Sequence, residues 1–192
     1  MIRRLYNWTL SLARSPHALW ALAAVAFIES SVFPIPPDVL MIPMILAAPR
    51  KAFVIAGVAT VSSVLGGLFG YWIGASLYET IGLPVLEFYG KTAYFETFGQ
   101  NYNEWGAWAV LIAGVTPFPY KVITILSGVT GLSLPVFMVA SVVARGLRFF
   151  LIAALLKRYG EPIRDFIDRR LGILFTLFVV ILIGSFVLLR FL

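Results

Sequence analysis

Apolar residues run through almost the whole chain and are interrupted only by short polar stretches. Residues 52–78, 133–156 and 172–192 are three continuous apolar runs. A helix needs roughly 20 apolar residues to cross a bilayer. Each run therefore predicts a transmembrane helix.

Two further apolar stretches, residues 18–48 and 105–132, contain matching proline-rich interruptions. The first reads Pro34-Ile35-Pro36-Pro37-Asp38-Val39 and the second reads Pro117-Phe118-Pro119-Tyr120-Lys121-Val122. Proline removes a backbone donor and clashes with the preceding turn, so each segment is expected to break a helix. Broken backbone at membrane depth must be covered by protein or line a wet cavity. We therefore expect two re-entrant hairpins whose tips contain Pro34, Pro36, Pro37, Pro117, Pro119 and Tyr120.

The distribution of charge orients these segments. Basic residues occur at Arg50-Lys51 and in the polar link at 157–170, whereas residues 79–104 carry four Glu and one Lys. Lys and Arg are enriched on the cytoplasmic side of membrane proteins, so we place the basic link in the cytoplasm and 79–104, read as an interfacial loop with short helices, outside. The two hairpins then enter from opposite faces. The predicted fold is an all-α integral membrane protein, an inverted repeat of a re-entrant helical hairpin plus a transmembrane helix, with a C-terminal transmembrane helix.

Three parts of the chain follow from this pattern. Residues 1–17 place apolar side chains on one helical stripe and are expected to lie in the headgroup region, although an ordinary basic lead-in explains them equally well. Residues 18–159 form the membrane domain with both hairpins. Residues 160–192 are a cytoplasmic link and the C-terminal span.

Composition supports a membrane protein and excludes several other classes. The chain is 60% hydrophobic and only 12% charged, and its net charge of +6 arises from basic residues that flank the spans. Nucleic acid is therefore rejected as a partner, and anionic lipid is favoured. With no cysteine and a single histidine, His17, neither a disulfide framework nor a Cys/His metal centre is available. No metal and no cofactor are expected.

Five ionisable residues fall at predicted membrane depth: Glu29, Asp38, Lys121, Arg145 and Arg148. Each costs about 2.5–3.5 kcal/mol when alone at the centre of a span, so pairing or water is required. We predict that they form a substrate- or ion-binding site in which the arginines clamp a phosphate. Three alternatives stay open: a structural Glu29–Arg pair, arginine snorkelling to an interface, and capping of the broken helices by Asp38 and Lys121.

Small residues form a ridge along one face of the first predicted span, residues 52–78. Gly66, Gly70 and Gly74 are spaced by four residues, with Gly67 beside them. Such a ridge lets helices approach closely in a membrane, so we interpret it as a packing surface.

The combined motifs resemble the DedA family, the bacterial branch of membrane proteins that share a VTT (SNARE-associated) domain. The resemblance is closest to the YqaA-like branch and covers about residues 18–159. It rests on Glu29, Pro34-Ile35-Pro36-Pro37-Asp38, Gly114-Val115-Thr116-Pro117-Phe118-Pro119-Tyr120-Lys121-Val122, Ser127-Gly128 and Ala144-Arg145-Gly146-Leu147-Arg148-Phe149-Phe150.

This resemblance implies a multi-pass protein of the bacterial inner membrane that moves lipids between leaflets. Undecaprenyl phosphate and phospholipids are the implied cargoes, proton coupling is a further expectation, and Glu29 and Asp38 correspond to the family's acids. The chain departs from the commoner pattern in which arginines flank the second proline segment. Here Val115 and Tyr120 occupy that neighbourhood, and Lys121 is the nearest base.

Several functions remain in competition. A flippase or scramblase for a phospholipid or polyprenyl phosphate is favoured, and a proton- or cation-coupled transporter of a small solute would use the same acids. A scaffold protein with buried ion pairs is a third reading. An enzyme is not expected, because no histidine or cysteine nucleophile lies at membrane depth. Membrane lipids are the expected partners, and homo-oligomer formation is left open.

Overall fold

The regular elements of the chain are helical throughout the part that the structure describes. A computed structural model describes the backbone of residues 17–32, 36–116 and 118–188, with side chains up to 160 and at 162. The elements are α2 (Ala18–Ser31), α3 (Asp38–Ala47), the 3-10 turn η1 (Pro49–Lys51), α4 (Ala52–Leu77), the π-turn η2 (Tyr78–Gly82), α5 (Leu83–Phe88), α6 (Thr92–Val115), α7 (Tyr120–Val129) and α8 (Leu134–Leu188).

Two of the helical segments are long and apolar enough to cross a membrane. They are Pro49–Phe88, which contains α4, and Leu134–Gly160, the first half of α8. The first segment contains the predicted span at 52–78, and the second covers the span predicted at 133–156 except for its first residue, so both predictions of long apolar helices are confirmed. Three shorter apolar helices, α2, α3 and α7, pack around them.

Both proline segments interrupt the helices as predicted. Helix α2 ends at Ser31 and α3 begins at Asp38, while α6 ends at Val115 and α7 begins at Tyr120. Pro37 and Pro119 stand directly before the new helices, with φ near −64° and −62°. A proline fits there because the first helical N–H groups have no partner within the helix. Pro36 is also described, whereas Pro34 and Pro117 lie outside the described residues.

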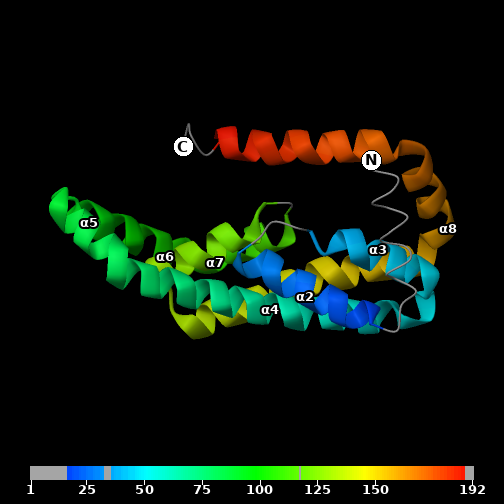
Figure 1. Cartoon of the computed structure of the whole chain (residues 1–192), viewed down its shortest axis with the longest axis horizontal. Helices are drawn as coiled ribbons and strands as arrows, with labels where there is room; N and C mark the ends of the chain where they lie inside the picture. The colour runs from blue at the N-terminus through cyan, green and yellow to red at the C-terminus, as the bar shows by residue number, and fades with distance from the viewer. Residues whose placement is uncertain (1–16, 33–35, 117, 189–192) are drawn as a thin grey trace.

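Helices from both halves of the chain pack against α4, and helices from both halves pack against α8 (Figure 1). Helix α2 packs against α4 at Gly66, which faces Phe27, and α7 packs nearer the end of α4, where Gly74 faces Ile125. Helix α6 packs near the start of α8, where Gly114 faces Ala144, and α3 packs further along α8, where Leu46 approaches Gly160. Helices α4 and α8 thus each contact helices from both halves of the chain.

The glycine ridge on α4 is a packing surface, as predicted. A side chain at Gly66 or Gly74 would meet the backbone of Phe27 or Ile125, and one at Gly70 would meet Thr124. From the other side, Gly128 of α7 lies against the backbone of Tyr71. Only glycine permits this approach, which sets the distance of α2 and α7 from α4.

Helix α6 begins earlier than the boundary at 105 predicted for the second hairpin. Helix α6 starts at Thr92, so most of the predicted interfacial loop at 79–104 is helical. The reason is an aromatic stripe on α6, in which Phe95, Phe98 and Tyr102 stack on one another along one face. Side chains three and four positions apart meet on a helix, and these contacts outweigh the polarity of the segment.

Fewer of the predictions for the two ends of the chain can be compared with the described residues. The amphipathic segment predicted for 1–17 lies outside the described residues except for His17. The backbone of α8 continues without interruption through the predicted polar link at 157–170 to Leu188. Most side chains of that link, and all of those in the predicted span at 172–192, lie outside the described residues.

We predict that Gly74→Ala destabilises the protein by about 1–3 kcal/mol, because the new Cβ would collide with backbone and force α7 away from α4. Gly57→Ala is the matched control, since it lies on the same helix with no atom within 4 Å of a Cβ placed there. The control should be neutral or slightly stabilising. Thermal unfolding in detergent measures both variants, and equal unfolding temperatures would contradict this packing.

Candidate functional site

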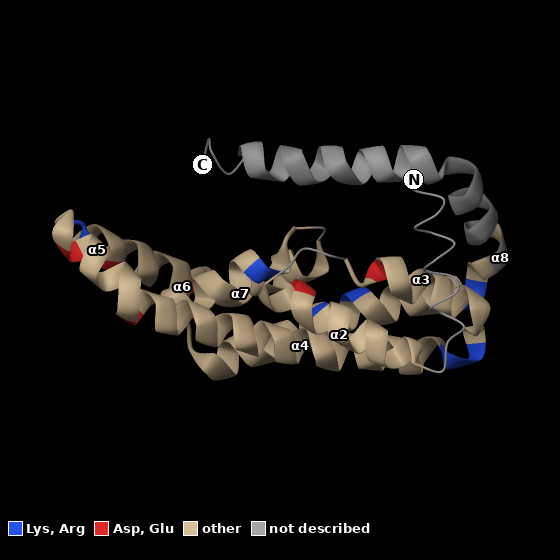
Figure 2. Ribbon diagram, viewed as in Figure 1, with Lys and Arg blue, Asp and Glu red and all other residues tan. Residues whose placement is uncertain are grey.

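The five charged residues predicted to form a site contact one another or the ends of the broken helices. Figure 2 shows charged residues where α2, α3 and α7 come together. Glu29 on α2 pairs with Arg145 on α8, and Asp38 at the start of α3 pairs with Arg148, one helical turn further along α8. Lys121, in the first turn of α7, bonds to the backbone of Val32 beyond the end of α2. We refer to Glu29–Arg145 as the inner pair and to Asp38–Arg148 as the outer pair.

The inner pair is almost completely buried. The side chain of Arg145 is 2% exposed and that of Glu29 is 11% exposed. The Nη2 of Arg145 donates to the Glu29 carboxylate at 2.5 Å, and its Nε donates to Ser63 Oγ at 2.6 Å. Ser30 completes the network, with hydrogen bonds to the same carboxylate oxygen and to Ser63. A buried ion pair is tolerated only when its remaining polar atoms are satisfied in this way.

Two aromatic rings enclose the guanidinium of Arg145. Its central carbon lies 4.8 Å from the ring centroids of both Tyr120 and Phe149. Tyr120 is itself fully buried and donates its hydroxyl hydrogen to Ser141 Oγ at 2.5 Å. The rings exclude water and add cation–π attraction, so the inner pair links α2, α4, α7 and α8 as a fixed unit.

The outer pair is more accessible and less fully satisfied. Its side chains are 17% exposed for Arg148 and 16% for Asp38, and the Nη2–Oδ2 distance is 2.5 Å. Within the described residues, Asp38 Oδ1 and Arg148 Nε are buried atoms without a hydrogen-bond partner. Buried polar atoms without partners are rare and need an explanation, and a ligand or water is the usual one. Both atoms are covered by protein, so a further polar group reaches them only when the outer pair moves.

Two basic side chains donate hydrogen bonds to carbonyl groups just beyond the two broken helices. Lys121 Nζ donates to Val32 O at 2.8 Å, just after α2, and Arg148 Nη1 donates to Thr116 O at 2.6 Å, just after α6. The last carbonyl groups of a helix lack partners and carry partial negative charge. Because proline prevents either helix from continuing, these two bases provide the missing donors.

This arrangement bears on the alternatives left open by the sequence. Glu29 does form a buried pair with an arginine, and Lys121 does cap a broken helix, although it caps α2 and not its own helix α7. Asp38 makes no side-chain capping bond and pairs with Arg148. Arg148 points to Asp38 and Thr116, so it does not snorkel to an interface.

Two residues of the hydrogen-bond network around Arg145, Ser63 and Ser141, were not predicted from the sequence. Both are fully buried within long apolar helices, where a lone serine is unremarkable. Their spacing offers a signal, because Ser63 is three residues before Gly66 on the packing ridge and Ser141 is four residues before Arg145. Among the residues that the structure describes, no group of three or more acidic, histidine or cysteine side chains could hold a metal ion.

We predict that Glu29→Gln lowers stability by about 3–5 kcal/mol, since it leaves the Arg145 charge buried without a counter-charge. Combining it with Arg145→Gln should restore much of the loss, because both charges are then removed. Asp38→Asn is the control and should cost less, since Arg148 is partly exposed and keeps its bond to Thr116. Thermal unfolding in detergent ranks the variants. If Asp38→Asn were the more damaging substitution, the assignment of inner and outer pairs would be wrong.

Comparison with known proteins is consistent with this architecture. An uncharacterized protein of Haemophilus influenzae is 33% identical over 186 residues, which cover 96% of each chain. An uncharacterized protein of Histophilus somni is 32% identical over 168 residues, covering 85% of this chain and 87% of the relative. No solved structure matches significantly. The family model described as the VTT domain matches residues 35–158. The chain therefore belongs to the VTT-domain family, of which the DedA membrane proteins are the bacterial branch.

Proposed function

We propose that this membrane protein is a flippase or scramblase that moves a phospholipid or polyprenyl phosphate between leaflets of the bacterial inner membrane. The observation that carries the proposal is the outer pair. It offers a partly exposed guanidinium with an unused Nε at the junction of two broken helices. A guanidinium with a free N–H is well suited to a phosphate oxygen.

The packing of helices from both halves of the chain on α4 and on α8 supports a re-entrant, inverted-repeat architecture. If α2–α3 and α6–α7 are hairpins that enter from opposite faces, their breaks lie near the bilayer midplane. The ion pairs and capping bases would then lie at the same depth, as in transporters built from inverted repeats. The charge distribution agrees with the predicted orientation, because Figure 2 shows Lys and Arg gathered at the end near α3 and mostly Asp and Glu at the end near α5.

In the proposed mechanism the outer pair exchanges partners. An anionic headgroup first meets the exposed part of the Arg148 side chain and the Lys121 ammonium, while its acyl chains stay in lipid. The phosphate then competes with Asp38 for Arg148, and return of Asp38 releases it. Protonation of the displaced carboxylate would couple the exchange to protons, since an unpaired acid at membrane depth favours its neutral form.

The inner pair has a different part in this mechanism. Arg145 has two rings against it and its Nε and Nη2 are already bonded, so it is poorly placed to receive a headgroup. Its proposed role is to hold α2, α4 and α8 in register so that Arg148 faces the breaks. The same observation favours the scaffold alternative, in which the ion pairs only specify the fold.

The decisive experiment follows labelled phospholipid and labelled polyprenyl phosphate across the same reconstituted vesicles. Arg148→Gln should reduce translocation by about tenfold or more, because it removes the charge that attracts phosphate. Arg148→Lys should retain part of the activity, since it keeps the charge but loses the directed donors. Arg50→Gln, an exposed basic residue away from the breaks, is the matched control and should behave as wild type.

Two outcomes would overturn the proposal. Wild-type protein that moves neither lipid would favour the scaffold or the small-solute transporter, and a solute-driven pH change in the same vesicles separates these two. Folded Arg148→Gln protein with full activity would show that lipid is moved without the outer pair.

A further inference from the structure

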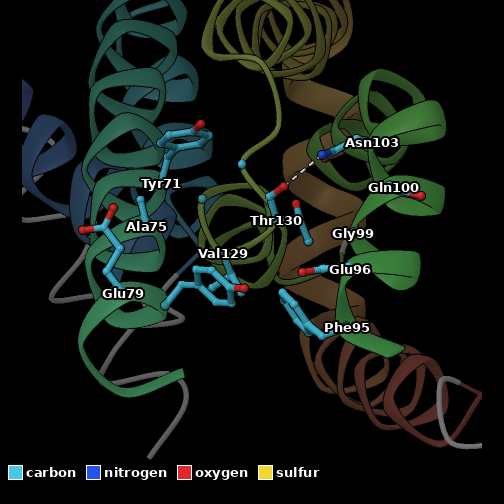
Figure 3. Close-up of a pocket in the computed structure, with 13 residues that line it drawn as sticks. Tyr71, Ala75, Glu79, Phe95, Glu96, Gly99, Gln100, Asn103, Val129 and Thr130 are labelled. Atoms are coloured by element: carbon cyan, nitrogen blue, oxygen red, sulfur yellow. Dashed lines mark hydrogen bonds between the residues drawn. The ribbon is translucent and has the colours of Figure 1, made fainter. Parts of the chain in front are cut away.

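A separate pocket lies at the acidic end of the molecule, away from the ion pairs (Figure 3). It has a volume of about 420 Å³ and is formed where the end of α4 and η2, the first half of α6 and the turn after α7 come together. We call it the outer pocket. Its walls include Tyr78, Glu79, Phe95, Glu96, Asn103 and Thr130.

The charges around the outer pocket all have the same sign. Glu79 and Glu96 stand on walls contributed by η2 and α6, and no Lys, Arg or His lines the pocket. Neither carboxylate forms an ion pair with any residue that the structure describes. Helix α7 also ends here, at Val129, and presents the negative end of its dipole. These contributions add, so the pocket attracts a cation.

A buried amide oxygen supplies a second, independent indication. Asn103 Nδ2 donates to Thr130 O at 2.9 Å, which fixes the orientation of the amide. Its Oδ1 is buried and has no donor among the described residues. An acceptor in this position needs a hydrogen-bond donor from outside the protein fold. Water or a donor group of a bound molecule would satisfy this oxygen, and the positive charge of that molecule is inferred from the carboxylates alone.

The size and the aromatic wall select the kind of cation. Tyr78 and Phe95 stack with their ring centroids 5.1 Å apart and present aromatic surface to the pocket. Aromatic surface attracts organic ammonium groups. A bare divalent ion would be held by several converging oxygen ligands, and the described residues contain no such cluster. The volume of the pocket also exceeds that of a single ion.

We propose that the outer pocket binds an organic ammonium group through Glu96, Glu79, Asn103 and the Tyr78–Phe95 wall. Two sources provide this chemistry: the headgroup of an aminophospholipid in the outer leaflet, or a small amine dissolved in the aqueous phase. The site is independent of phosphate recognition by Arg148, because it shares no residue with the ion pairs.

Equilibrium dialysis of labelled ethanolamine against detergent-purified full-length protein tests the soluble source. Nanodiscs containing either phosphatidylethanolamine or phosphatidylglycerol test the lipid source, with a photoactivatable aminophospholipid as the probe. Glu79→Gln with Glu96→Gln should weaken binding in the responding arm by about tenfold, because both attractive charges are lost. Glu87→Gln is the matched control, since it is exposed on α5 but does not line the pocket.

Binding in either arm that the double substitution removes and the control retains would support the proposal and identify the source. No binding of ethanolamine and no labelling by the lipid probe would overturn it. An equal loss in Glu87→Gln would also overturn it, because the attraction would then be a general effect of surface charge. Thermal unfolding confirms that the variants are folded, and exposed carboxylates without ion pairs are not expected to affect it.

Discussion

Two helices that end inside an apolar protein need hydrogen-bond donors for their last carbonyl groups, and the rest of the structure depends on how that need is met. Proline prevents α2 and α6 from continuing, and lipid offers no donors. Lys121 supplies a donor near the end of α2 and Arg148 supplies one near the end of α6. Lys121 belongs to the other half of the chain from α2, whereas Arg148 belongs to the same half as α6. The first break is therefore completed only when the two halves pack together, and the glycine contacts of α4 with α2 and α7 bring them close enough.

The two ion pairs lie along one face of α8 and differ in burial: the inner pair suits a structural role and the outer pair suits ligand binding. Arg145 faces Glu29, two serines and two aromatic rings, and only Glu29 keeps a small exposed surface. One turn later, Arg148 faces Asp38 with atoms on both side chains still unpaired. A rigid buried pair next to a partly satisfied exposed pair is suited to a binding site, because the first fixes the geometry and the second can exchange ligands. The proposed lipid movement relies on this difference.

Much of the fold followed from local sequence signals, while the pairing of distant residues did not. Proline chemistry located both breaks, and the length of the apolar runs located α4 and the first half of α8. The cost of burying charge singled out the five residues that lie at the breaks. The start of α6 was missed because contacts between Phe95, Phe98 and Tyr102 outweigh local polarity. Which acid meets which arginine, and the roles of Ser63 and Ser141, depend on helix packing that one sequence does not encode locally.

The central claim is that the outer pair is open to water within the membrane domain while the inner pair is not. Because the chain has no cysteine, single thiols can be introduced without background labelling. We would measure the reaction of Asp38→Cys, Lys121→Cys and Ser30→Cys with a membrane-impermeant maleimide, in vesicles exposed from each side. The account predicts reaction at positions 38 and 121 and none at Ser30, which is fully buried. Equal reaction at all three positions, or reaction only at Ser30, would contradict it.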